Sequence, residues 1–593
     1  MHYSPQQNPG STDSWLPPRG FERIAFLVLI ALTLALKVLA IQHFRSDSDE
    51  TQHAHVVWSW VTGQLQYRDV FDNHMPLFQM LCAPVMAFFG ERADIMICLR
   101  WVLLPFYFIS LFAVYRLTES LYSRRAALWS ALFAATAYKF FYTSTEFRTD
   151  QLWAAFWLLG LMVLAGGEFT FRRAFLSALL IGLSGAVSVK SVPLVVALGA
   201  SAAVAFGIGW LRGERQRLGP SVAKLAVGAA AMLIPSILVI LYFVKRGVFW
   251  SMYYCVIAHN MVPGLKRWGN FSLHQWYFPL SVPLLAAYAW LIFRQTPIRS
   301  LAIRRALILL MPWFFVFILM SYWPDITRED DLPYVPLIPL SLFPLVILAG
   351  KALRGERLHQ LFWTYGVPAL ALGNLAFTYH YHNIREDRMQ VTTHNIADVL
   401  ALTRPDDFVM DDKGDYVYRR RAYYWVLEPI TKARFRLGLI HGKTIPQRLT
   451  ETGTKVCSLV IGKEGSLASQ FIEHNYLPCD PNTRDLGVLG KIIGRDASGG
   501  TDRFDVVIPQ QYAVTTESGT LAGELDGKPY TGPVWLAAGT HTFHRTSGNG
   551  RVAIFLADAA EKGFKPLYDL ADELMKERGT FTPDKRNRAP ELQ

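Results

Sequence analysis

Charged residues are scarce in this sequence. Only 18% of its 593 residues are Asp, Glu, Lys or Arg, whereas 52% are hydrophobic, and the mean hydropathy is +0.21. Soluble chains carry about a quarter charged residues. The composition therefore argues against a soluble enzyme and against a disordered chain.

Several familiar motifs are missing as well. The chain has no GxxxxGK[ST] phosphate-binding loop, no GxGxxG following a strand and no HExxH. It shows no internal repeat of fixed period, which argues against a transporter built from duplicated halves. Of the five cysteines, only Cys457 and Cys479 lie in the last third, and whether they form a disulfide stays open.

The charges that are present divide the chain into two parts. Residues 380–593 hold 28 basic and 28 acidic residues, which cancel, whereas residues 1–379 hold 31 basic and 19 acidic residues and supply the whole net charge of +12. The charge density of the second part is close to that of soluble proteins. We therefore expect a transmembrane domain over residues 1–379 and a water-soluble region after it.

Long apolar runs predict about eleven transmembrane helices. They lie near residues 24–43, 95–115, 126–142, 151–166, 174–189, 191–210, 222–244, 277–293, 304–322, 333–349 and 360–378. The apolar stretch 76–90 is short and opens with Pro76, so it is left out of the count. With that choice the basic clusters between spans fall on one side, which predicts a cytoplasmic N-terminus and an extracytoplasmic C-terminal region in the cell inner (plasma) membrane.

The C-terminal region divides in two by its patterns. Residues 380–500 indicate a mixed α/β region, and residues 501–593 alternate apolar and polar residues between Gly-rich turns. This alternation predicts a β-sandwich-like region with a C-terminal helix. The predicted fold class is a polytopic α-helical membrane protein with an extracytoplasmic mixed α/β and β-sandwich region.

Polar residues gather in the segments predicted to face outward. The first outer loop, residues 44–94, contains Asp49 and Glu50 near its start and then Tyr67, Asp69 and His74. Carboxylates at a membrane surface are costly unless they are hydrated or paired, so they mark a candidate site. A solvated loop with an N-capping Asp is the alternative. His53 and His55 could ligate a divalent metal, but they lack a third ligand at a diagnostic spacing.

Cations also lie on the predicted outer face. Arg148 precedes the second acid, Asp150, at a helix start, and Lys190 either reaches lipid headgroups or holds a phosphate. Arg100 lies inside a span and is expected to pair with a loop carboxylate or a phosphate. Lys266 lies among aromatic residues in a segment suited to membrane lipids. The candidate phosphate ligands are Arg100, Arg148, Lys190, Lys266 and Arg328.

The order of these motifs resembles the GT-C integral-membrane glycosyltransferases. The shared features are an Asp-Glu after the first span, Tyr-Arg-Asp followed by His-x-Pro-Leu, Glu-x-Arg-x-Asp in the second loop, the Lys of Ser-Val-Lys-Ser, and Tyr-Val-Pro-Leu-Ile-Pro. Within that class the chain is most similar to the aminoarabinose-lipid A transferase and protein O-mannosyltransferase group. The likeness covers roughly residues 20–380, and Met75 stands where the group usually has a proline.

The resemblance implies a GT-C fold and a polyprenyl-phosphate sugar donor. A hexosyl or pentosyl group would pass, with inversion, to a lipid, glycan or protein acceptor. Asp49 would be the catalytic acid/base with Glu50 beside it, Asp150 would be the second acid, and Lys190 would contact the donor phosphate. No cofactor is required, because fixed cations can stabilise the leaving phosphate, and neither a metal site nor a nucleic-acid partner is indicated.

Two other functions stay open at this stage. A polytopic transporter or lipid flippase with an extracytoplasmic glycan-binding domain would also have many spans, but it predicts charges at mid-span and duplicated symmetry. A scaffold that binds glycan without catalysis would not need acids at the membrane edge. The gathering of acids and cations on one face favours the transferase.

Overall fold

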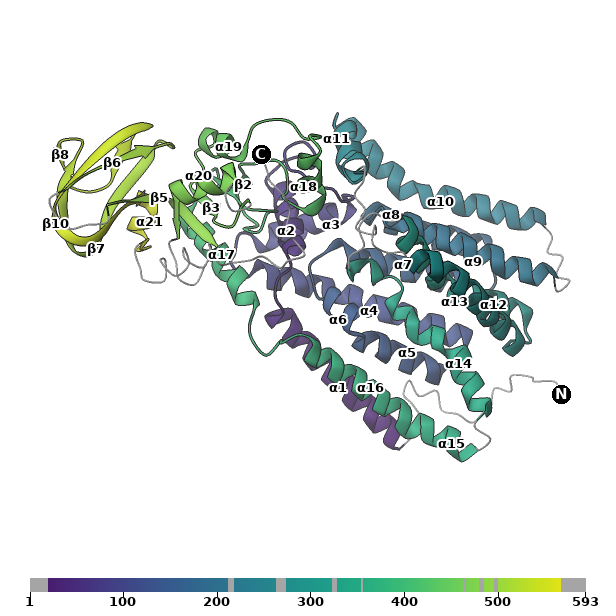
Figure 1. Cartoon of the computed structure of the whole chain (residues 1–593). Coiled ribbons are helices and arrows are strands. Elements are labelled where there is room, and N and C mark those ends of the chain that lie inside the picture. Colours follow the sequence, from purple (N-terminus) through teal and green to yellow (C-terminus); the bar gives the residue numbers. More distant parts are fainter. Residues whose placement is uncertain are drawn as a thin grey trace. The chain divides into compact units, whose positions relative to one another are not determined.

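The computed structural model describes residues 20–211, 218–262, 273–322, 328–352, 356–462, 466–478, 485–494 and 500–566 (Figure 1). The chain forms two compact units. Unit 1 comprises residues Met1–Phe44, Arg100–Tyr242 and Lys266–Glu386, and unit 2 comprises Arg45–Leu99, Phe243–Leu265 and Asp387–Gln593. The predicted first outer loop and part of the fourth thus fold together with the C-terminal region.

Unit 1 is helical throughout its described part. Its elements, two of which extend into unit 2, are α1 Phe21–His43, α4 Ile95–Leu121, α5 Arg124–Thr136, α6 Tyr138–Thr143, α7 Thr149–Ala165, α8 Phe171–Val187, α9 Ser191–Leu211, α10 Leu218–Lys245, α12 Leu273–Gln295, α13 Arg299–Tyr322, η2 Arg328–Asp331, η3 Val335–Leu337, α14 Ile338–Ala352, α15 Glu356–Leu361, η4 Phe362–Gly366 and α16 Val367–Tyr381.

The predicted spans coincide with these helices. Each of the eleven overlaps one helix or a run of consecutive helical elements, because long apolar runs favour helix in a membrane, where internal prolines such as Pro105 and Pro235 are tolerated. Five helices of the described part are long and apolar enough to cross a membrane: Phe21–His43, Ile95–Leu121, Ser191–Trp210, Val222–Lys245 and Ser300–Leu319. The others are shorter, so the number eleven stays a prediction, as does the orientation, while a multi-pass membrane protein is confirmed.

Helix packing in unit 1 relies on both small and apolar residues. A Cβ built on Gly182 of α8 would lie 2.2 Å from the carbonyl oxygen of Met232 in α10, so these two helices approach to backbone contact at a position that only glycine fits. Large apolar side chains of α10 face away from the protein; Leu238, for example, is 62% exposed. Such a face is stable against lipid tails but costly in water.

One core of unit 1 joins the first and last of its helices. Phe26 of α1 meets Trp129 of α5 edge to face, with ring centroids 5.3 Å apart, and Leu375 of α16 is buried in the same cluster. Figure 1 shows α1 and α16 running side by side. This packing places the C-terminal end of α1, and with it the start of the first predicted outer loop, beside the end of α16.

Unit 2 combines helices from the predicted outer loops with the C-terminal strands. Its helices are α2 Ser48–Val61, α3 Leu77–Phe89, α11 Phe249–Tyr253, the π-helix η1 Tyr254–Ala258, α17 Met389–Leu402, α18 Pro429–Arg436, α19 Ile445–Glu451, α20 Leu467–Asn475 and α21 Ala557–Glu561. The stretch 76–90, left out of the predicted spans, forms the 13-residue helix α3. That length is too short for a span.

The strands of unit 2 form one hydrogen-bonded series. They are β1 Phe408–Met410, β2 Arg420–Arg421, β3 Val456–Ser458, β4 Tyr476–Pro478, β5 Leu486–Gly494, β6 Thr501–Val506, β7 Gln510–Leu525, β8 Lys528–Pro529, β9 Val534–Leu536 and β10 Gly539–Leu556. Among the described residues their order is β2-β1-β3-β5-β10-β7-β8, with β4 on β5, β6 on β10 and β9 on β7. The predicted C-terminal sheet region is confirmed, and it is continuous with the α/β part.

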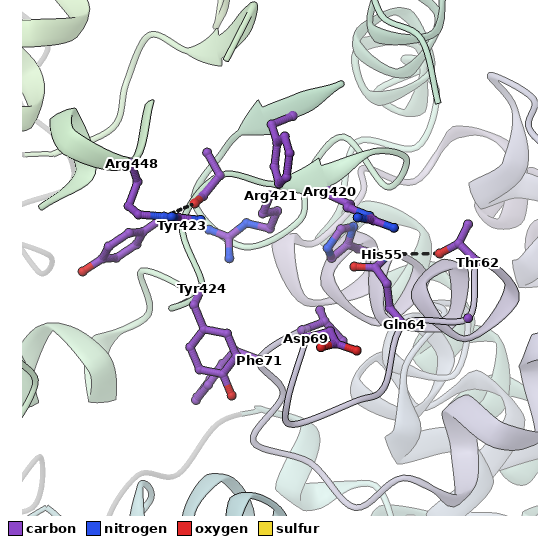
Figure 2. A pocket seen from close by; sticks show the side chains of 14 residues that line it. His55, Thr62, Gln64, Asp69, Phe71, Arg420, Arg421, Tyr423, Tyr424 and Arg448 are labelled. Atoms are coloured by element: carbon purple, nitrogen blue, oxygen red, sulfur yellow. Dashed lines mark hydrogen bonds between the residues drawn. The ribbon is translucent and has the colours of Figure 1, made fainter. Parts of the chain in front are cut away.

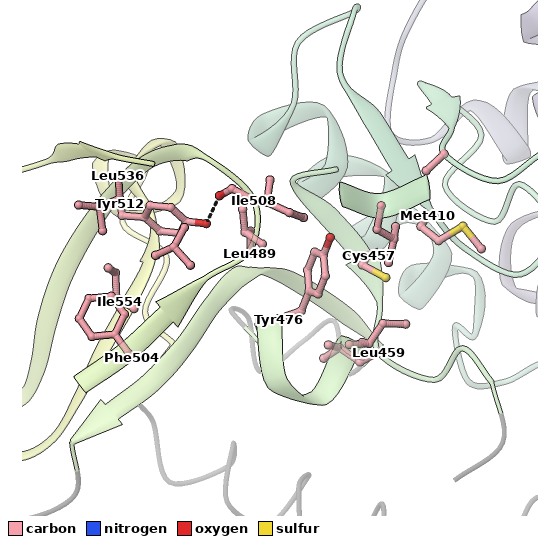
Figure 3. Close-up of a cluster of buried hydrophobic side chains, with 14 of the residues drawn as sticks. Met410, Cys457, Leu459, Tyr476, Leu489, Phe504, Ile508, Tyr512, Leu536 and Ile554 are labelled. Carbon is pink, nitrogen blue, oxygen red and sulfur yellow. Dashed lines mark hydrogen bonds between the residues drawn. The ribbon is translucent and has the colours of Figure 1, made fainter. Parts of the chain in front are cut away.

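Strand β5 makes that continuity. Its first half pairs with β3 and its second half pairs with β10, both antiparallel. One cluster of buried side chains consequently extends from Met410 and Cys457 to Tyr512 and Ile554 (Figure 3). Cys457 is a buried free thiol in this cluster, and Cys479 lies outside the described residues, as does the chain after residue 566.

Candidate functional site

Asp49 is held by the first turn of α2. Asp47 caps this helix: its side chain accepts a hydrogen bond from the backbone N–H of Asp49, and the carboxylate of Glu50 accepts one from the backbone N–H of Asp47 at 3.1 Å. This reciprocal capping box fixes the helix start. Glu50 is fully buried in that role, whereas the side chain of Asp49 is 26% exposed. Of the two acids, Asp49 is therefore the one that a substrate can reach.

Lys413 is the cation beside Asp49. Its Nζ lies 2.5 Å from Oδ1 of Asp49, across 364 residues of chain. Burial alone would lower the pKa of Lys413, but Asp49 and Glu428 outweigh that effect and raise it. The ammonium is therefore charged at neutral pH, and it favours the ionised form of the carboxylate.

A tight turn brings Lys413 to this place. Gly414 has a φ of +107°, and a Cβ built on it would lie 2.7 Å from Cβ of His55. Asp411 accepts hydrogen bonds from the backbone N–H groups of Gly414, at 2.7 Å, and Tyr416. The turn thus packs directly on α2, and only glycine satisfies both the backbone angle and the contact.

His74 and Asp72 form a second polar group in unit 2. Nδ1 of His74 lies 2.8 Å from Oδ1 of the fully buried Asp72, which also accepts hydrogen bonds from Gln66 and Gln79. Burial opposes protonation of His74, but Asp72 outweighs it and raises the pKa of the imidazole. The hydroxyl of Tyr67 donates to the carbonyl oxygen of His74 at 2.7 Å. Of the predicted first-loop residues, Tyr67 and His74 are thus joined by hydrogen bonds.

Asp69 points to another part of the loop. It accepts hydrogen bonds from its neighbour Arg68, at 2.8 and 2.9 Å, and from the backbone N–H of Leu65. These bonds, first the one from Arg68, lower the pKa of the carboxylate. Asp69 lines a cavity of about 490 Å³ in unit 2.

Glu428 is a buried acid whose charge acts on Lys413, the partner of Asp49. Burial raises its pKa to about 7, against the pull of Lys413 and His74. Asn73 donates a hydrogen bond to it at 2.8 Å, and Nε2 of His259 lies 3.8 Å away. Burial, aided by Arg434, lowers the pKa of His259 to about 3, so that imidazole is neutral.

A separate cluster in unit 1 contains Asp150, Arg148 and Lys190. Nε of Arg148 lies 3.2 Å from Asp150, and Nζ of Lys190 lies 3.6 Å from Asp150 and 2.7 Å from Asp330. Glu329 lies 3.6 Å from Arg148. Burial alone would lower the pKa of Lys190, but the carboxylates, Asp330 first, raise it. The structure thus brings together the predicted second acid, Asp150, and two predicted cations.

Lys37 of α1 supports the loop that carries this cluster. Its buried ammonium donates to the carbonyl oxygen of Phe141 at 2.7 Å, to Oγ of Ser144 at 2.9 Å and to Oγ1 of Thr145 at 2.7 Å. All three of its donors are therefore used. Lys37 anchors the residues that directly precede Glu146 and Arg148.

The remaining predicted cations lie elsewhere or outside the described part. Arg100 is buried and donates to the carbonyl oxygens of Phe44, at 2.7 Å, and Ile41, at 3.4 Å, where α1 ends. Arg328 begins η2, but its side chain is outside the described part, and Lys266 lies wholly outside it.

The two histidines considered as metal ligands point to different partners. Nδ1 of His55 donates to the carbonyl oxygen of Val417 at 2.8 Å, whereas the ring of His53 packs edge to face on His74. Within the ranges that the structure describes, no group of three or more His, Cys, Asp or Glu side chains could hold a metal ion.

Sequence reasoning missed Lys413, Glu428 and Asp72 as members of these clusters. Lys413 and Glu428 lie in a region that was read only for its strands and turns, and their contacts with the first loop span more than 350 residues. The one signal in the sequence that could have indicated the His74 cluster was the position of Asp72, two residues before His74 in the acidic loop.

Comparison with known proteins gives matches of structure only. No family model matches the chain, and no curated protein matches its sequence. ArnT from Cupriavidus metallidurans matches in two crystal structures, one bound to undecaprenyl phosphate and one in the apo state, with TM-scores of 0.51 and 0.52, 12% identity, and coverage of 78% of this chain and 97% of that chain. The Archaeoglobus fulgidus oligosaccharyltransferase in its apo form matches with a TM-score of 0.43 and 10% identity over 93% of this chain and 98% of that chain.

The likeness to ArnT establishes the fold. The match covers 97% of the ArnT chain and 78% of this chain. It therefore extends beyond the region, roughly residues 20–380, in which the sequence motifs lie. The oligosaccharyltransferase match is too distant to add to it. The GT-C-like fold that the sequence motifs predicted is confirmed.

Proposed function

We propose that the protein is a membrane glycosyltransferase that uses a polyprenyl-phosphate-linked sugar. The observation that carries this proposal is the fold shared with ArnT, one structure of which holds undecaprenyl phosphate. The sugar passes with inversion to a lipid, glycan or protein acceptor on the extracytoplasmic face of the inner membrane. The donor sugar is a hexose or a pentose.

Asp49 is the proposed general base. An acceptor hydroxyl attacks C1 of the sugar, its proton passes to Asp49, and the bond between C1 and the phosphate oxygen breaks, leaving polyprenyl phosphate. A positioned base of this kind contributes about 10²- to 10⁴-fold to a rate. The partial exposure of Asp49 and its ion pair with Lys413 support this role, because an ionised carboxylate is required.

Lys190 is the proposed ligand of the departing phosphate, with Arg148 as a positioning residue. The side chain of Lys190 is 20% exposed, whereas that of Arg148 is 5% exposed and is held between Asp150 and Glu329. Charge that develops on the leaving oxygen is stabilised by a fixed ammonium. A phosphate bound at Lys190 would have to share Nζ with the carboxylates of Asp330 and Asp150. Asp150 would therefore affect how strongly Lys190 binds the phosphate.

The test compares Asp49→Asn with Asp94→Asn in cells that lack the natural gene. Asp94 is a matched control in the same unit, because its carboxylate forms an exposed pair with Arg92. Mass spectrometry of envelope lipids and glycans is expected to show a gene-dependent sugar with the natural protein and with Asp94→Asn, but not with Asp49→Asn at equal membrane levels. A full product yield from a well-folded Asp49→Asn protein would exclude Asp49 as the base.

A further inference from the structure

Unit 2 contains a cavity of about 490 Å³ that the proposed reaction does not use (Figure 2). Five parts of the chain line it: α2 through His55, the turn after α2 from Thr62 to Phe71, β1 through Phe408, β2 with the residues that follow it, and α19 through Arg448. Its volume falls in the range of about 300–1,000 Å³ that is typical of small-molecule sites. The cavity is therefore large enough for a ligand of saccharide size.

Three arginines line this cavity, and they differ in how their charges are compensated. Arg421 is neutralised by Asp411, 2.7 Å away, and donates to three backbone carbonyls as well. Arg448 donates to the carbonyl oxygen of Ala422 at 3.1 Å and pairs with Glu451. Both hold the local fold in place.

Arg420 is different from these two. It is exposed, and its side chain makes no hydrogen bond or ion pair with the described residues. Its charge acts on Asp69, but Asp69 is already paired with Arg68. The cavity consequently keeps one uncompensated guanidinium, a group that binds carboxylate or phosphate through two parallel hydrogen bonds.

Aromatic rings form the opposite part of the lining. The hydroxyl of Tyr424 donates to the carbonyl oxygen of Tyr67 at 2.6 Å, and its ring meets Phe71 at 5.7 Å between centroids. Tyr423 is buried and stacks on Phe435. Figure 2 shows the polar ends of Gln64 and Asp69 facing this cavity as well. Fixed aromatic faces with a few polar groups at their edge suit a sugar ring.

One residue that lines the cavity also contacts the turn next to the proposed base. His55 lines it and contacts Gly414, and Lys413, the neighbour of that glycine, holds Asp49. The imidazole Nδ1 of His55 donates to the carbonyl oxygen of Val417, which fixes the ring between the cavity and the turn. His55 therefore connects the lining of the cavity with the turn that carries Lys413.

We infer that this cavity binds an anionic saccharide, with Arg420 on its carboxylate or phosphate and Tyr423 and Tyr424 against its ring. The ligand's place in the reaction rests on the proposed function, in which the saccharide is part of the acceptor. Binding itself does not depend on that function.

The experiment measures binding to the purified full chain in detergent by titration calorimetry, without a donor. The probes are methyl glucuronide and glucose 6-phosphate, with methyl glucoside as the neutral sugar and inorganic phosphate as the bare anion. Arg420→Gln is compared with Arg436→Gln, a control in which an exposed arginine of α18 outside the cavity is changed.

We expect saturable binding of at least one charged sugar, at least tenfold tighter than methyl glucoside and than inorganic phosphate. Arg420→Gln should weaken it tenfold or more, since charge-assisted hydrogen bonds are lost, while Arg436→Gln should not change it. Absence of saturable binding by both charged sugars, equal binding of methyl glucoside, or an unchanged affinity of Arg420→Gln would overturn the inference. Equal binding of inorganic phosphate would reduce the cavity to an anion site and overturn it too.

The two proposals fail in different ways. Asp49→Asn should retain full binding of the charged sugar, because Asp49 does not line the cavity. If no envelope product depends on the gene but binding and its loss in Arg420→Gln are seen, the proposed function fails and the saccharide site stands. If the product is made and the cavity binds no charged sugar, the saccharide site fails and the proposed function stands.

Discussion

Replacement of Lys413 by Met tests the ion pair between Lys413 and Asp49, which lie 364 residues apart in the sequence. The change keeps the aliphatic stem and removes the ammonium that lies 2.5 Å from Asp49. Because the side chains of Lys413 and Asp49 are only 16% and 26% exposed, water can replace the lost partner only in part. The variant should therefore be less stable than the natural protein and should transfer sugar more slowly.

The size of the effect follows from the geometry. At the ion-pair distance of 2.5 Å, Coulomb attraction with an effective dielectric constant of about 20 is roughly 7 kcal/mol, which is an upper limit. Desolvation of the two groups offsets most of it, so the net coupling should be about 2–3 kcal/mol. If Asp49 is the base and Lys413 positions it, the same energy lowers the rate of transfer about 30- to 160-fold.

The assay is a double-mutant cycle on the full chain in detergent. Melting temperatures are measured for the natural protein, Lys413→Met, Asp49→Asn and the double variant. We expect the double variant to melt no lower than the less stable single variant, because its charges are removed together. Lys443→Met is the control: Lys443 makes a pair of similar length, 2.7 Å, but its side chain is 59% exposed, so little change is expected.

Two results would refute this reasoning. If the losses of melting temperature in the two single variants simply add in the double variant, Lys413 and Asp49 are not energetically coupled. If Lys413→Met loses stability but retains the natural transfer rate, while Lys413→Arg behaves like the natural protein in both respects, the ion pair is structural and does not position Asp49.

Two further predictions concern other buried ionisable groups. Burial raises the pKa of Glu428 from 4.5 to about 7, so the stability that its protonated form contributes is present below pH 4.5 and is lost as the pH rises through 7. Glu428→Gln should therefore be more stable than the natural protein at pH 8, by up to about 3 kcal/mol, and nearly as stable at pH 5. A difference in melting temperature that does not change with pH would contradict this. Lys37→Met should lower the melting temperature because it removes three buried hydrogen bonds of the ammonium, each worth up to about 3 kcal/mol, although Ser144 and Thr145 still donate to the carbonyl oxygen of Phe141. Lys245→Met, at an exposed position of α10, should not lower it, and equal effects of the two changes would show that Lys37 does not anchor the loop.

Much of the fold could be predicted because its cause is local. Long apolar runs favour helix wherever lipid surrounds the chain, and each predicted span coincides with helical residues. The start of α2 also follows from a local pattern, since Asp47 and Glu50 stand at the spacing of a capping box. An N-capping Asp in this loop was only the alternative to a candidate site, and the helix α2 itself was not predicted.

The contacts that complete the candidate sites could not be predicted, because their causes are not local. The pairing of β5 with both β3 and β10 depends on register between distant segments, which alternation alone does not fix. Lys413 stands in a turn of ordinary sequence, and nothing near it indicates that the partner is Asp49. The uncompensated charge of Arg420 becomes visible only once the neighbouring arginines have been assigned their partners.

The lysines of this chain show how partner chemistry and exposure together distinguish a structural cation from a functional one. Lys37 is 1% exposed, and its three donors are satisfied by one carbonyl and two hydroxyl groups, so no ligand can reach it. Lys190 and Lys413 are 20% and 16% exposed and are paired with carboxylates. A carboxylate can exchange with a phosphate or take up a proton during a reaction, whereas a backbone carbonyl can do neither. In the sequence all three look alike, each as a Lys beside apolar residues or in a turn. The contacts in the structure indicate that Lys37 supports the fold, and we expect the loss of Lys190 or Lys413 to alter the reaction.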